Sequence, residues 1–338
     1  IPEWAAIDEL YPISREQTDY SLPEPDANWG WPKLFYYVDQ ILGFYDRIPI
    51  HPLRGKAERK IIDWLKDHQE RDGSWGGIQP PWVYSLIALH QLGFEMDHPV
   101  MEQGFSGFEG FVIEDEETFI VQPCISPVWD TCLAQIALVE SGIPVSSSMI
   151  QKSTRWLLNR QILEPGDWQV RAKGTEPGGW SFEFENVQYP DIDDAAEVII
   201  ALASVRLTPE EDFRRQEAVE RCLNWLLALQ SKNGGWASFD KDNNRKYLAK
   251  IPFADFGEML DPPSVDVTAH LVEMFGKLGY SQEFAPLKRA CDYIKREQEA
   301  DGSWFGRWGV NYIYGTGAVL PAMAAVGELS LIHISEPT

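Results

Sequence analysis

One short pattern recurs four times along this 338-residue chain: a Gln, then a turn that contains Gly, then a Trp. The four copies occupy residues 69–75, 161–168, 230–236 and 298–304, so the second copy ends at Trp168. An aromatic residue stands five positions before each Gln and an aliphatic residue four before it, which places each Gln at the end of an amphipathic helix. The pattern therefore predicts one repeated unit, a helix followed by a Gly-containing turn.

A second, more apolar segment follows each turn, and a fifth segment is of the same kind: residues 81–92, 129–141, 194–205, 266–278 and 315–326. Amphipathic outer helices that alternate with apolar inner helices are what an α/α barrel or toroid requires, because inner helices have neighbours on every side. We therefore expect an all-α fold. The Gln and Trp of each copy are expected to be scaffold, with the Gln amide closing a helix end and stacking on the indole. Long loops rich in Pro, Gly and acids are expected at residues 21–33, 104–123 and 240–263.

The composition narrows the possible functions. With 52 Asp and Glu against 29 Lys and Arg, the net charge of −23 argues against nucleic acid, whose phosphates attract a surplus of bases. No apolar run approaches the roughly 18–20 residues of a spanning helix, and the four Cys lack CxxC spacing, as expected of reduced thiols in a cytoplasmic chain. The 14 Trp, 12 Tyr and 16 Phe are the unusual feature, and they indicate a site that uses aromatic rings.

The sharpest local feature is a group of carboxylates at the beginning of an inner helix, Asp191, Asp193 and Asp194, with Glu197 one turn later. Acids at a helix start can simply stabilise the macrodipole. However, this helix continues as apolar residues on all sides, and crowded carboxylates in apolar surroundings raise at least one pKa, which produces a proton donor. The same residues also form a DDxxE pattern that could hold Mg²⁺ and a diphosphate, although no basic cluster accompanies it.

His270 is the histidine with a possible polar partner. It lies one helical turn after Asp266, so the carboxylate can hold the imidazole and keep it cationic. An imidazolium that donates to Asp193 would strengthen Asp193 as an acid. Aromatic residues surround the starts of the inner helices, and rings stabilise carbocations without reacting with them. No nucleophile elbow, phosphate loop, zinc pattern or nucleotide fingerprint is found.

These residues resemble the triterpene cyclases, and most closely the squalene–hopene cyclase branch. The resemblance covers about residues 1–328, and it rests on the repeats and on residues 75–82, 126–131, 191–194, 251–256, 261–270 and 305–317. It implies a two-barrel architecture of which this chain lacks both ends. Residues 1–118 would be part of the second α-barrel domain and residues 119–328 part of the catalytic α/α barrel. Residues 329–338 depart from the family pattern and are expected to be a foreign tail.

The resemblance also implies roles for particular residues. Asp193 would protonate a terminal double bond of squalene, with Asp191 and Asp194 in support and His270, beside Asp266, hydrogen-bonded to Asp193; no metal or cofactor is implied. Gln79 matches a position that organises the water near the last cation. Further matches are cavity residues that stabilise cations and residues at the constriction of the substrate channel: Trp129, Phe182, Phe239, Phe253, Ala254, Phe256, Trp308 and Tyr314.

The implied activity is class II, protonation-initiated cyclisation of squalene to a hopene-type pentacycle, with hopanol as a possible product. Family members sit on one membrane face, so the expected location is the cytoplasmic face of the membrane, and a homodimer is a possible assembly. Ala195 replaces the usual Thr, and Phe239 stands where a relative can have Tyr, so two hydroxyl groups are missing. Because family chains are longer, we expect a truncated fragment to be inactive.

Three other interpretations stay open from the sequence. Another class II cyclase would act on oxidosqualene or a diterpene precursor, although the first branch typically has Asp-Cys-Thr-Ala-Glu at the acid site. A metal-dependent prenyl diphosphate enzyme would use Asp193, Asp194 and Glu197 as ligands. An acidic, Trp-rich α/α toroid could instead act on carbohydrate through paired carboxylates.

Overall fold

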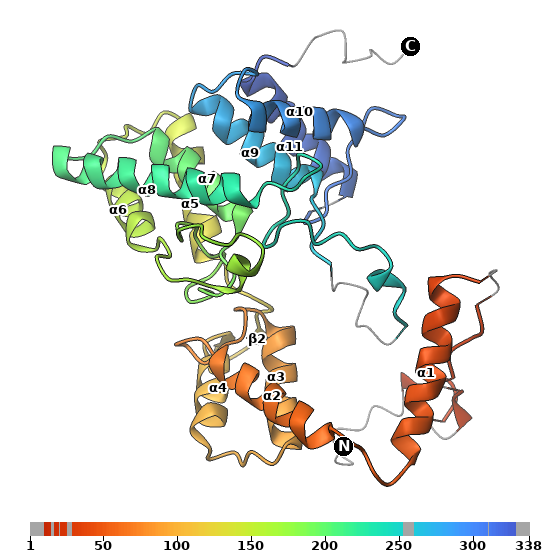
Figure 1. The fold of residues 1–338 in the computed structure, drawn as a ribbon. Coiled ribbons are helices and arrows are strands. Elements are labelled where there is room, and N and C mark those ends of the chain that lie inside the picture. Colours follow the sequence, from red (N-terminus) through yellow and green to blue (C-terminus); the bar gives the residue numbers. More distant parts are fainter. Residues whose placement is uncertain are drawn as a thin grey trace. The chain divides into compact units, whose positions relative to one another are not determined.

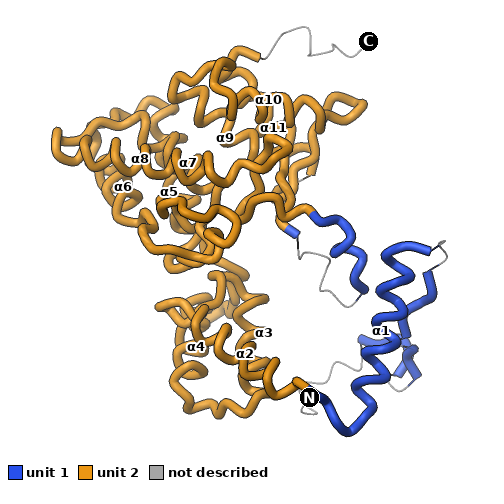
Figure 2. Tube along the Cα trace, viewed as in Figure 1, with its two compact units in different colours: residues 1–52, 245–260 blue, residues 53–244, 261–338 orange. Residues whose placement is uncertain are grey.

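The computed structural model describes residues 10–14, 17–19, 21–25, 29–252, 260–309 and 311–328. They fold mainly into α-helices, which confirms the all-α prediction (Figure 1). The chain divides into two compact units, which Figure 2 colours separately. One consists of residues 1–52 with 245–260, and the other of residues 53–244 with 261–338.

The smaller unit is built around helix α1 (Trp31–Arg47), with the short 3₁₀ helix η5 (Leu248–Lys250) packed against it. The rings of Trp31 and Tyr247 stack with centroids 4.6 Å apart, which joins two segments that are distant in the sequence. No residue of α1 is buried, and Ile41 and Phe44 are 66% and 68% exposed. Within this unit, α1 therefore presents a largely apolar surface.

The larger unit contains the other helices and one small sheet. Its elements are α2 (Arg54–Asp67), α3 (Gln79–Gln91), α4 (Pro99–Glu109), β1 (Val112–Glu114), β2 (Phe119–Val121), α5 (Pro127–Glu140), α6 (Ser148–Asn159), η4 (Asp167–Val170), α7 (Ile192–Ala203), α8 (Pro209–Leu229), α9 (Val265–Lys277), α10 (Ala285–Arg296) and α11 (Asn311–Ala325). Strands β1 and β2 pair as an antiparallel hairpin, with Ile113 opposite Ile120. Residues 104–123 are therefore not the loop expected from their composition, because they include the end of α4 and this hairpin.

Inner and outer helices alternate as the repeats predict. Helices α5, α7, α9 and α11 pack side by side in chain order, and α6, α8 and α10 pack against them. Every residue of α7 from Ile192 to Leu202 is buried, as expected of a helix with neighbours on all sides. The flanking helices α5 and α11 instead leave apolar residues such as Leu133 and Ile313 exposed.

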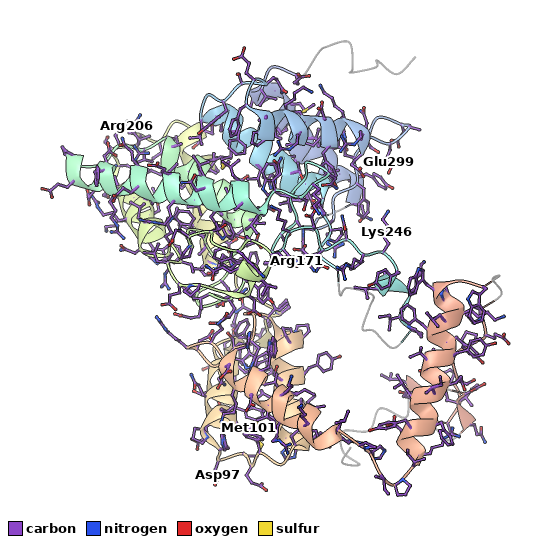
Figure 3. The ribbon with its side chains drawn as sticks, viewed as in Figure 1. Asp97, Met101, Arg171, Arg206, Lys246 and Glu299 are labelled. Atoms are coloured by element: carbon purple, nitrogen blue, oxygen red, sulfur yellow. The ribbon has the colours of Figure 1, made fainter. Side chains whose placement is uncertain are left out.

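A separate core cluster lies between α3 and α4. Trp82 is fully buried there, with Phe108 and Phe111 packed edge-on against its ring. Met101 on α4, labelled in Figure 3, belongs to the same cluster. Among the described residues, none of the helices combines the length and the hydropathy needed to cross a membrane.

The repeats act as scaffold through hydrogen bonds. In the first copy, the Gln69 amide donates to the carbonyls of Gly73 and Val100, and the Trp75 indole donates to the Leu65 carbonyl. Each copy thus ties a helix end to its own turn. In the first three copies the Gln amide also donates to a carbonyl of the next outer helix, at its start in the first and third copies and in its middle in the second. These bonds confirm that the Gln amide closes a helix end, and its stacking on the indole stays a prediction.

The second copy ends at Trp180 and not at Trp168. The Trp180 indole donates to the Leu157 carbonyl at 2.7 Å, the bond that Trp236 and Trp304 make to Leu226 and Ile294 in their copies. The indole nitrogen of Trp168 is buried without a hydrogen-bond partner. An insertion between Gln161 and the Gly-Gly-Trp turn explains the wrong assignment, since Gln161 donates to the Gly178 carbonyl across it.

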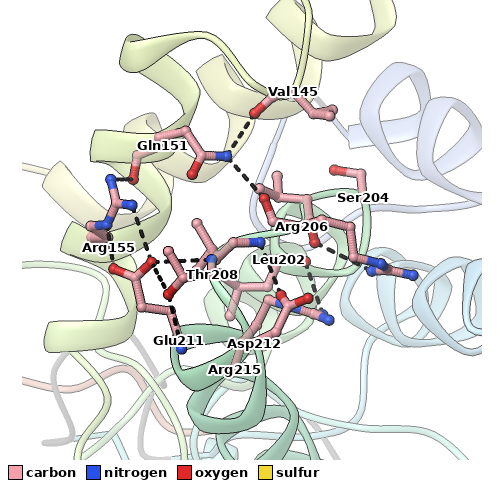
Figure 4. A network of polar contacts seen from close by, with 12 residues as sticks. Val145, Gln151, Arg155, Leu202, Ser204, Arg206, Thr208, Glu211, Asp212 and Arg215 are labelled. Atoms are coloured by element: carbon pink, nitrogen blue, oxygen red, sulfur yellow. Dashed lines mark hydrogen bonds and ion pairs between the residues drawn. The ribbon is translucent and has the colours of Figure 1, made fainter.

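A polar network fixes the beginning of α8 against α6 and the end of α7 (Figure 4). Thr208 and Glu211 form a capping box, which satisfies free amide groups at the helix start. Arg155 of α6 donates twice to Glu211, at 2.6 and 3.1 Å. Arg215 donates to Asp212 and to the Leu202 carbonyl, so the last turn of α7 is held as well.

Candidate active site

The candidate site begins at the first turn of α7. Asp191 is the N-cap residue, and its side chain accepts a hydrogen bond from the Asp193 amide at 2.8 Å. The Asp191 amide donates to the Trp180 carbonyl at 2.7 Å, so the repeat turn fixes the position of the cap. Asp193 and Asp194 are 7% and 1% exposed. The local sequence thus places three carboxyl groups in a turn that is almost closed to water.

Burial shifts the pKa of two of these groups in the same direction. It raises the pKa of Asp191 well above its ordinary value, and the charge of Asp193 raises it further. Burial likewise raises the pKa of Asp194, with Asp191 and Asp193 as the next causes. One Asp194 oxygen has no hydrogen-bond partner. Burial therefore favours the neutral form of both flanking carboxyl groups, which limits the negative charge around Asp193.

Within the described part of the chain, His270 of α9 supplies the one cation in contact with Asp193. Its Nδ1 lies 2.5 Å from Asp193 Oδ1. Burial lowers the pKa of His270, but the charge of Asp193, their hydrogen bond and the charges of Glu197 and Asp266 together raise this pKa to about 10. His270 is therefore an imidazolium at neutral pH, and its Nδ1–H donates to Asp193 Oδ1. The structure brings together the two residues that the resemblance paired.

The expected pairing of Asp266 with His270 is wrong in its geometry. Asp266 Oδ2 accepts a hydrogen bond from the Trp308 amide at 2.8 Å, and its other oxygen has no partner. Asp266 contributes to His270 only through its charge. The spacing of Asp266 and His270 on α9 allows a contact between them. The observed partner of Asp266 is instead the Trp308 amide, which belongs to the loop before α11 and could not be predicted from the sequence of α9.

Glu197 also belongs to this site, which the sequence did not predict. In the sequence analysis Glu197 was considered only as a metal ligand. Its Oε1 lies 4.0 Å from His270 Nδ1, one helical turn after Asp193 on the same face of α7. Burial raises the pKa of Glu197 to about 7, although the charge of His270 lowers it. A cavity of about 330 Å³ lies beside it, lined by Glu197, His270, Glu273, Ile313, Tyr314, Gly317, Ala318 and Pro321.

Aromatic rings surround the imidazole. The rings of Trp129 and Tyr314 each lie 6.1 Å from the His270 ring, on α5 and α11 respectively. Phe239 and Trp308 form an edge-on pair at 6.1 Å, and the Asp266–Trp308 bond connects this pair to α9. These four predicted residues therefore gather around the start of the inner helices.

Other predicted residues lie elsewhere. Gln79 is the first residue of α3, and its amide donates to the Gln122 carbonyl at 2.5 Å. Phe182 is half-buried in the loop before α7. Among the described residues, neither has a hydrogen bond or ring contact with the Asp193–His270 pair. Phe253, Ala254, Phe256 and residues 329–338 lie outside the described residues.

Metal binding has no geometric support here: in the described part of the chain, no three His, Cys, Asp or Glu side chains gather closely enough to hold an ion.

Comparison with known proteins adds the family. The profile of the Squalene-hopene cyclase N-terminal domain matches residues 1–117, and that of the Squalene-hopene cyclase C-terminal domain matches residues 125–333. The chain belongs to the squalene–hopene cyclase family. The predicted boundary at residue 118 and the catalytic role of residues 119–328 stay predictions.

Three relatives show how far this membership extends. The chain is 47% identical to the squalene–hopene cyclase of Alicyclobacillus acidocaldarius over 97% of its own length and 51% of that protein. It is 39% identical to the dammaradiene synthase of Dryopteris crassirhizoma over 96% of the chain and 48% of the synthase. It is 36% identical to the squalene–hopene cyclase of Schizosaccharomyces japonicus over 96% of the chain and 50% of that enzyme. The chain thus spans about half the length of the curated relatives it matches.

Proposed function

We propose that this chain carries the protonation centre of a class II triterpene cyclase, which converts squalene to a hopene-type pentacycle. The observation that carries the proposal is the buried contact of 2.5 Å between Asp193 and the cationic His270, surrounded by aromatic rings. The names of the family's members, two squalene–hopene cyclases and a dammaradiene synthase among them, support a polycyclic triterpene as product.

Asp193 acts as the acid. It transfers its proton to a terminal double bond, and the carbocation forms as the carboxylate is left behind. The Nδ1–H of His270 already points at Asp193 Oδ1, so the new negative charge meets a fixed donor at once. Asp191 and Asp194 support the step because, when neutral, they add no charge that would hold the proton back.

The aromatic rings stabilise the cation as cyclisation proceeds. Trp129 and Tyr314 lie next to the imidazole, where the first cation would form, and the Phe239–Trp308 pair follows. Ring faces attract positive charge but provide no lone pair that would trap it. Phe182, Phe253 and Phe256 are proposed for the rest of the cavity and channel, and Gln79 for the place where the last cation loses a proton to water.

Each cycle must return one proton to Asp193. Glu197 lies 4.0 Å from the same Nδ1 that binds Asp193, and it lines the cavity that also reaches Tyr314. A group with a pKa of about 7 exchanges protons readily at neutral pH. Glu197 is therefore the proposed route by which a proton from the cavity replaces the one given to the substrate.

The proposed site of action is the cytoplasmic face of a membrane. The exposed apolar residues of α1, Ile41 and Phe44 among them, are suited to the interface between water and lipid. Co-sedimentation with lipid vesicles tests this proposal. The double change Ile41→Asp and Phe44→Asp is expected to abolish co-sedimentation, and Phe213→Asp, at an exposed position of α8, to leave it unchanged. Homodimers are a further proposal, which sedimentation velocity in detergent tests.

The activity itself needs a test that separates the site from the length of the chain. Squalene in detergent would be incubated with this chain and with a chimera in which the chain replaces the matching half of the Alicyclobacillus acidocaldarius enzyme. Products would be identified by gas chromatography with mass detection. We expect a pentacycle from the chimera, none from its Asp193→Asn variant and none from the chain alone. A folded chimera without product, or an Asp193→Asn variant with full activity, would overturn the proposal.

A further inference from the structure

A second pair of buried carboxyl groups lies away from the Asp193–His270 contact. Glu70 belongs to the turn of the first repeat, and Glu183 belongs to the loop that leads to α7. They are 6% and 1% exposed. The proposed chemistry uses neither of them.

The loop before α7 is folded around these two carboxyl groups. The Phe184 amide donates to Glu183 Oε2 at 2.7 Å, and the Glu185 amide donates to Glu183 Oε1 at 3.1 Å. The amides of Val187 and Gln188 interact with Glu70, which comes from a segment more than 100 residues earlier. Consecutive amides of one loop therefore serve side chains from two distant parts of the sequence.

The turn of the first repeat also packs directly on Glu183. Gly77 has φ of +65°, and a Cβ atom there would lie 2.1 Å from Glu183 Cγ. Only glycine fits both this conformation and this close approach. Gly77 stands two residues before Gln79, and Phe182 directly precedes Glu183. Glu183 thus lies where the segment that carries Gln79 meets the segment that carries Phe182.

No cation neutralises this pair among the described residues. Arg71 on the same turn donates to Glu164, and His68 contacts Asp167, which also accepts from Tyr189. The Asp72 charge acts on both glutamates and favours their protonated forms. Burial, as the largest cause, raises the pKa of each glutamate to about 7, although the loop amides oppose the shift. We call the contact between the Gln79 turn and the Phe182 loop, with Glu70 and Glu183 in it, the junction. Its charge therefore changes near neutral pH.

We infer that Glu183, together with Glu70, is a positioning residue that holds the Gln79 turn against the Phe182 loop when at least one of the two carboxyl groups carries a proton. Loss of both protons places two like charges in a buried site without a counter-ion, which pushes the two segments apart. The junction thereby couples the geometry of two proposed cavity residues to pH. This inference rests on the proposed function for the roles of Gln79 and Phe182, but not for the junction itself.

The first experiment needs no catalytic activity. The melting temperature of the chain would be measured by circular dichroism from pH 5.5 to 8.5, for wild type, Glu183→Gln and Glu70→Gln. Glu185→Gln is the matched control, because Glu185 lies in the same loop and is only half-buried. We expect the wild-type melting temperature to fall as the pH rises through 7, and each glutamine variant to lie about 5 °C above it at pH 8.5. At pH 5.5 the variants should lie closer to wild type, because less of the wild-type stability has been lost there.

Equal pH dependence in wild type and both glutamine variants would overturn the inference. So would unfolding of both variants at pH 5.5, since glutamine has nearly the shape of the protonated acid. The chimera then tests the link to catalysis: Glu183→Gln should flatten the fall of the squalene cyclisation rate above pH 7 and leave the rate at pH 6 within about twofold. An unchanged pH–rate profile would refute the positioning role. A flattened stability profile with an inactive chimera would refute the proposed function and, with it, the catalytic meaning of the junction.

Discussion

Two helices of this chain begin with three acidic residues, and the two groups behave in opposite ways. Helix α7 begins at Asp191, Asp193 and Asp194, and helix α8 carries Glu210, Glu211 and Asp212 in its first turn. Burial raises the pKa of Asp191 and Asp194 well above the ordinary value. At α8, the hydrogen bonds from Arg155 and Thr208 lower the pKa of Glu211 to about 2.

The helix macrodipole is common to both sites, so it cannot explain the difference. What differs is access to water and to cations. Helix α7 packs between α5 and α9, and the one cation it meets among the residues that the structure describes is the His270 imidazolium. The start of α8 is exposed and meets Arg155 and Arg215. The comparison teaches that an acidic helix start becomes an acid site through its neighbours and not through its own sequence.

The largest expected effect comes from opening the α7 start to water. Trp180 is fully buried, and its carbonyl accepts the Asp191 amide. We expect Trp180→Ala to lower the free energy of unfolding by about 3–5 kcal/mol, since a large buried ring is lost. Urea denaturation followed by tryptophan fluorescence measures this change. A loss below 1 kcal/mol would mean that Trp180 does not close the site.

A milder pair of changes isolates the indole hydrogen bond. Trp180→Phe should cost about 1 kcal/mol more than Trp168→Phe, because only the Trp180 indole has a partner, the Leu157 carbonyl. Equal costs would contradict the assignment of Trp180 to the second repeat.

That assignment shows where sequence reasoning ends. The helices could be predicted because their apolar periodicity is local, and all five inner segments end within two residues of the ends of the observed helices. The Trp of the second repeat could not, because an insertion moved the turn away from Gln161 and a nearer Trp fitted the spacing. Local patterns thus predict elements, but they fail where the chain is interrupted.

The candidate site shows the same limit. The residues alone suggested that His270 donates to Asp193, and the resemblance implied the same pair. The partner of Asp266, however, is an amide 42 residues later. Glu197 was visible one turn after Asp193, yet its position beside His270 depends on how α7 and α9 pack. A single sequence does not predict such contacts, because the two segments that make them are not separated by a fixed number of residues.

A further large effect is expected at Glu197, where removing a buried acidic group should stabilise the fold and not destabilise it. The pKa of Glu197 is raised from 4.5 to about 7, so the stability of the wild type is fully present below pH 4.5 and is lost as pH rises through 7. Glu197→Gln should therefore stabilise the fold by about 3 kcal/mol at pH 8.5 and leave it unchanged at pH 4. Urea midpoints at the two pH values measure this. A variant that is less stable than wild type at pH 8.5 would show that the fold lowers the pKa of Glu197 and does not raise it.

Two substitutions compare the cation at the start of α7, His270, with the cation at the start of α8, Arg155, in the reaction. In the chimera, His270→Ala should lower the squalene cyclisation rate about 100-fold, because the carboxylate left on Asp193 loses its donor. Arg155→Ala removes the main cation of the α8 start and should leave the rate unchanged. Similar rates for both variants would break the distinction between the two acid clusters.

The smallest effect is expected at the exposed cluster, and it has the opposite sign. The pKa of Glu211 is lowered from 4.5 to about 2, so its contribution is present above pH 4.5 and is lost as pH falls through 2. Glu211→Gln should lower the urea midpoint slightly at pH 7, and the difference should shrink toward pH 2. Glu210→Gln is the matched control, since Glu210 is exposed in the same turn and has no ion pair among the described residues. If both variants lose equally, the macrodipole and not Arg155 stabilises this turn, and the contrast with α7 would then rest on burial alone.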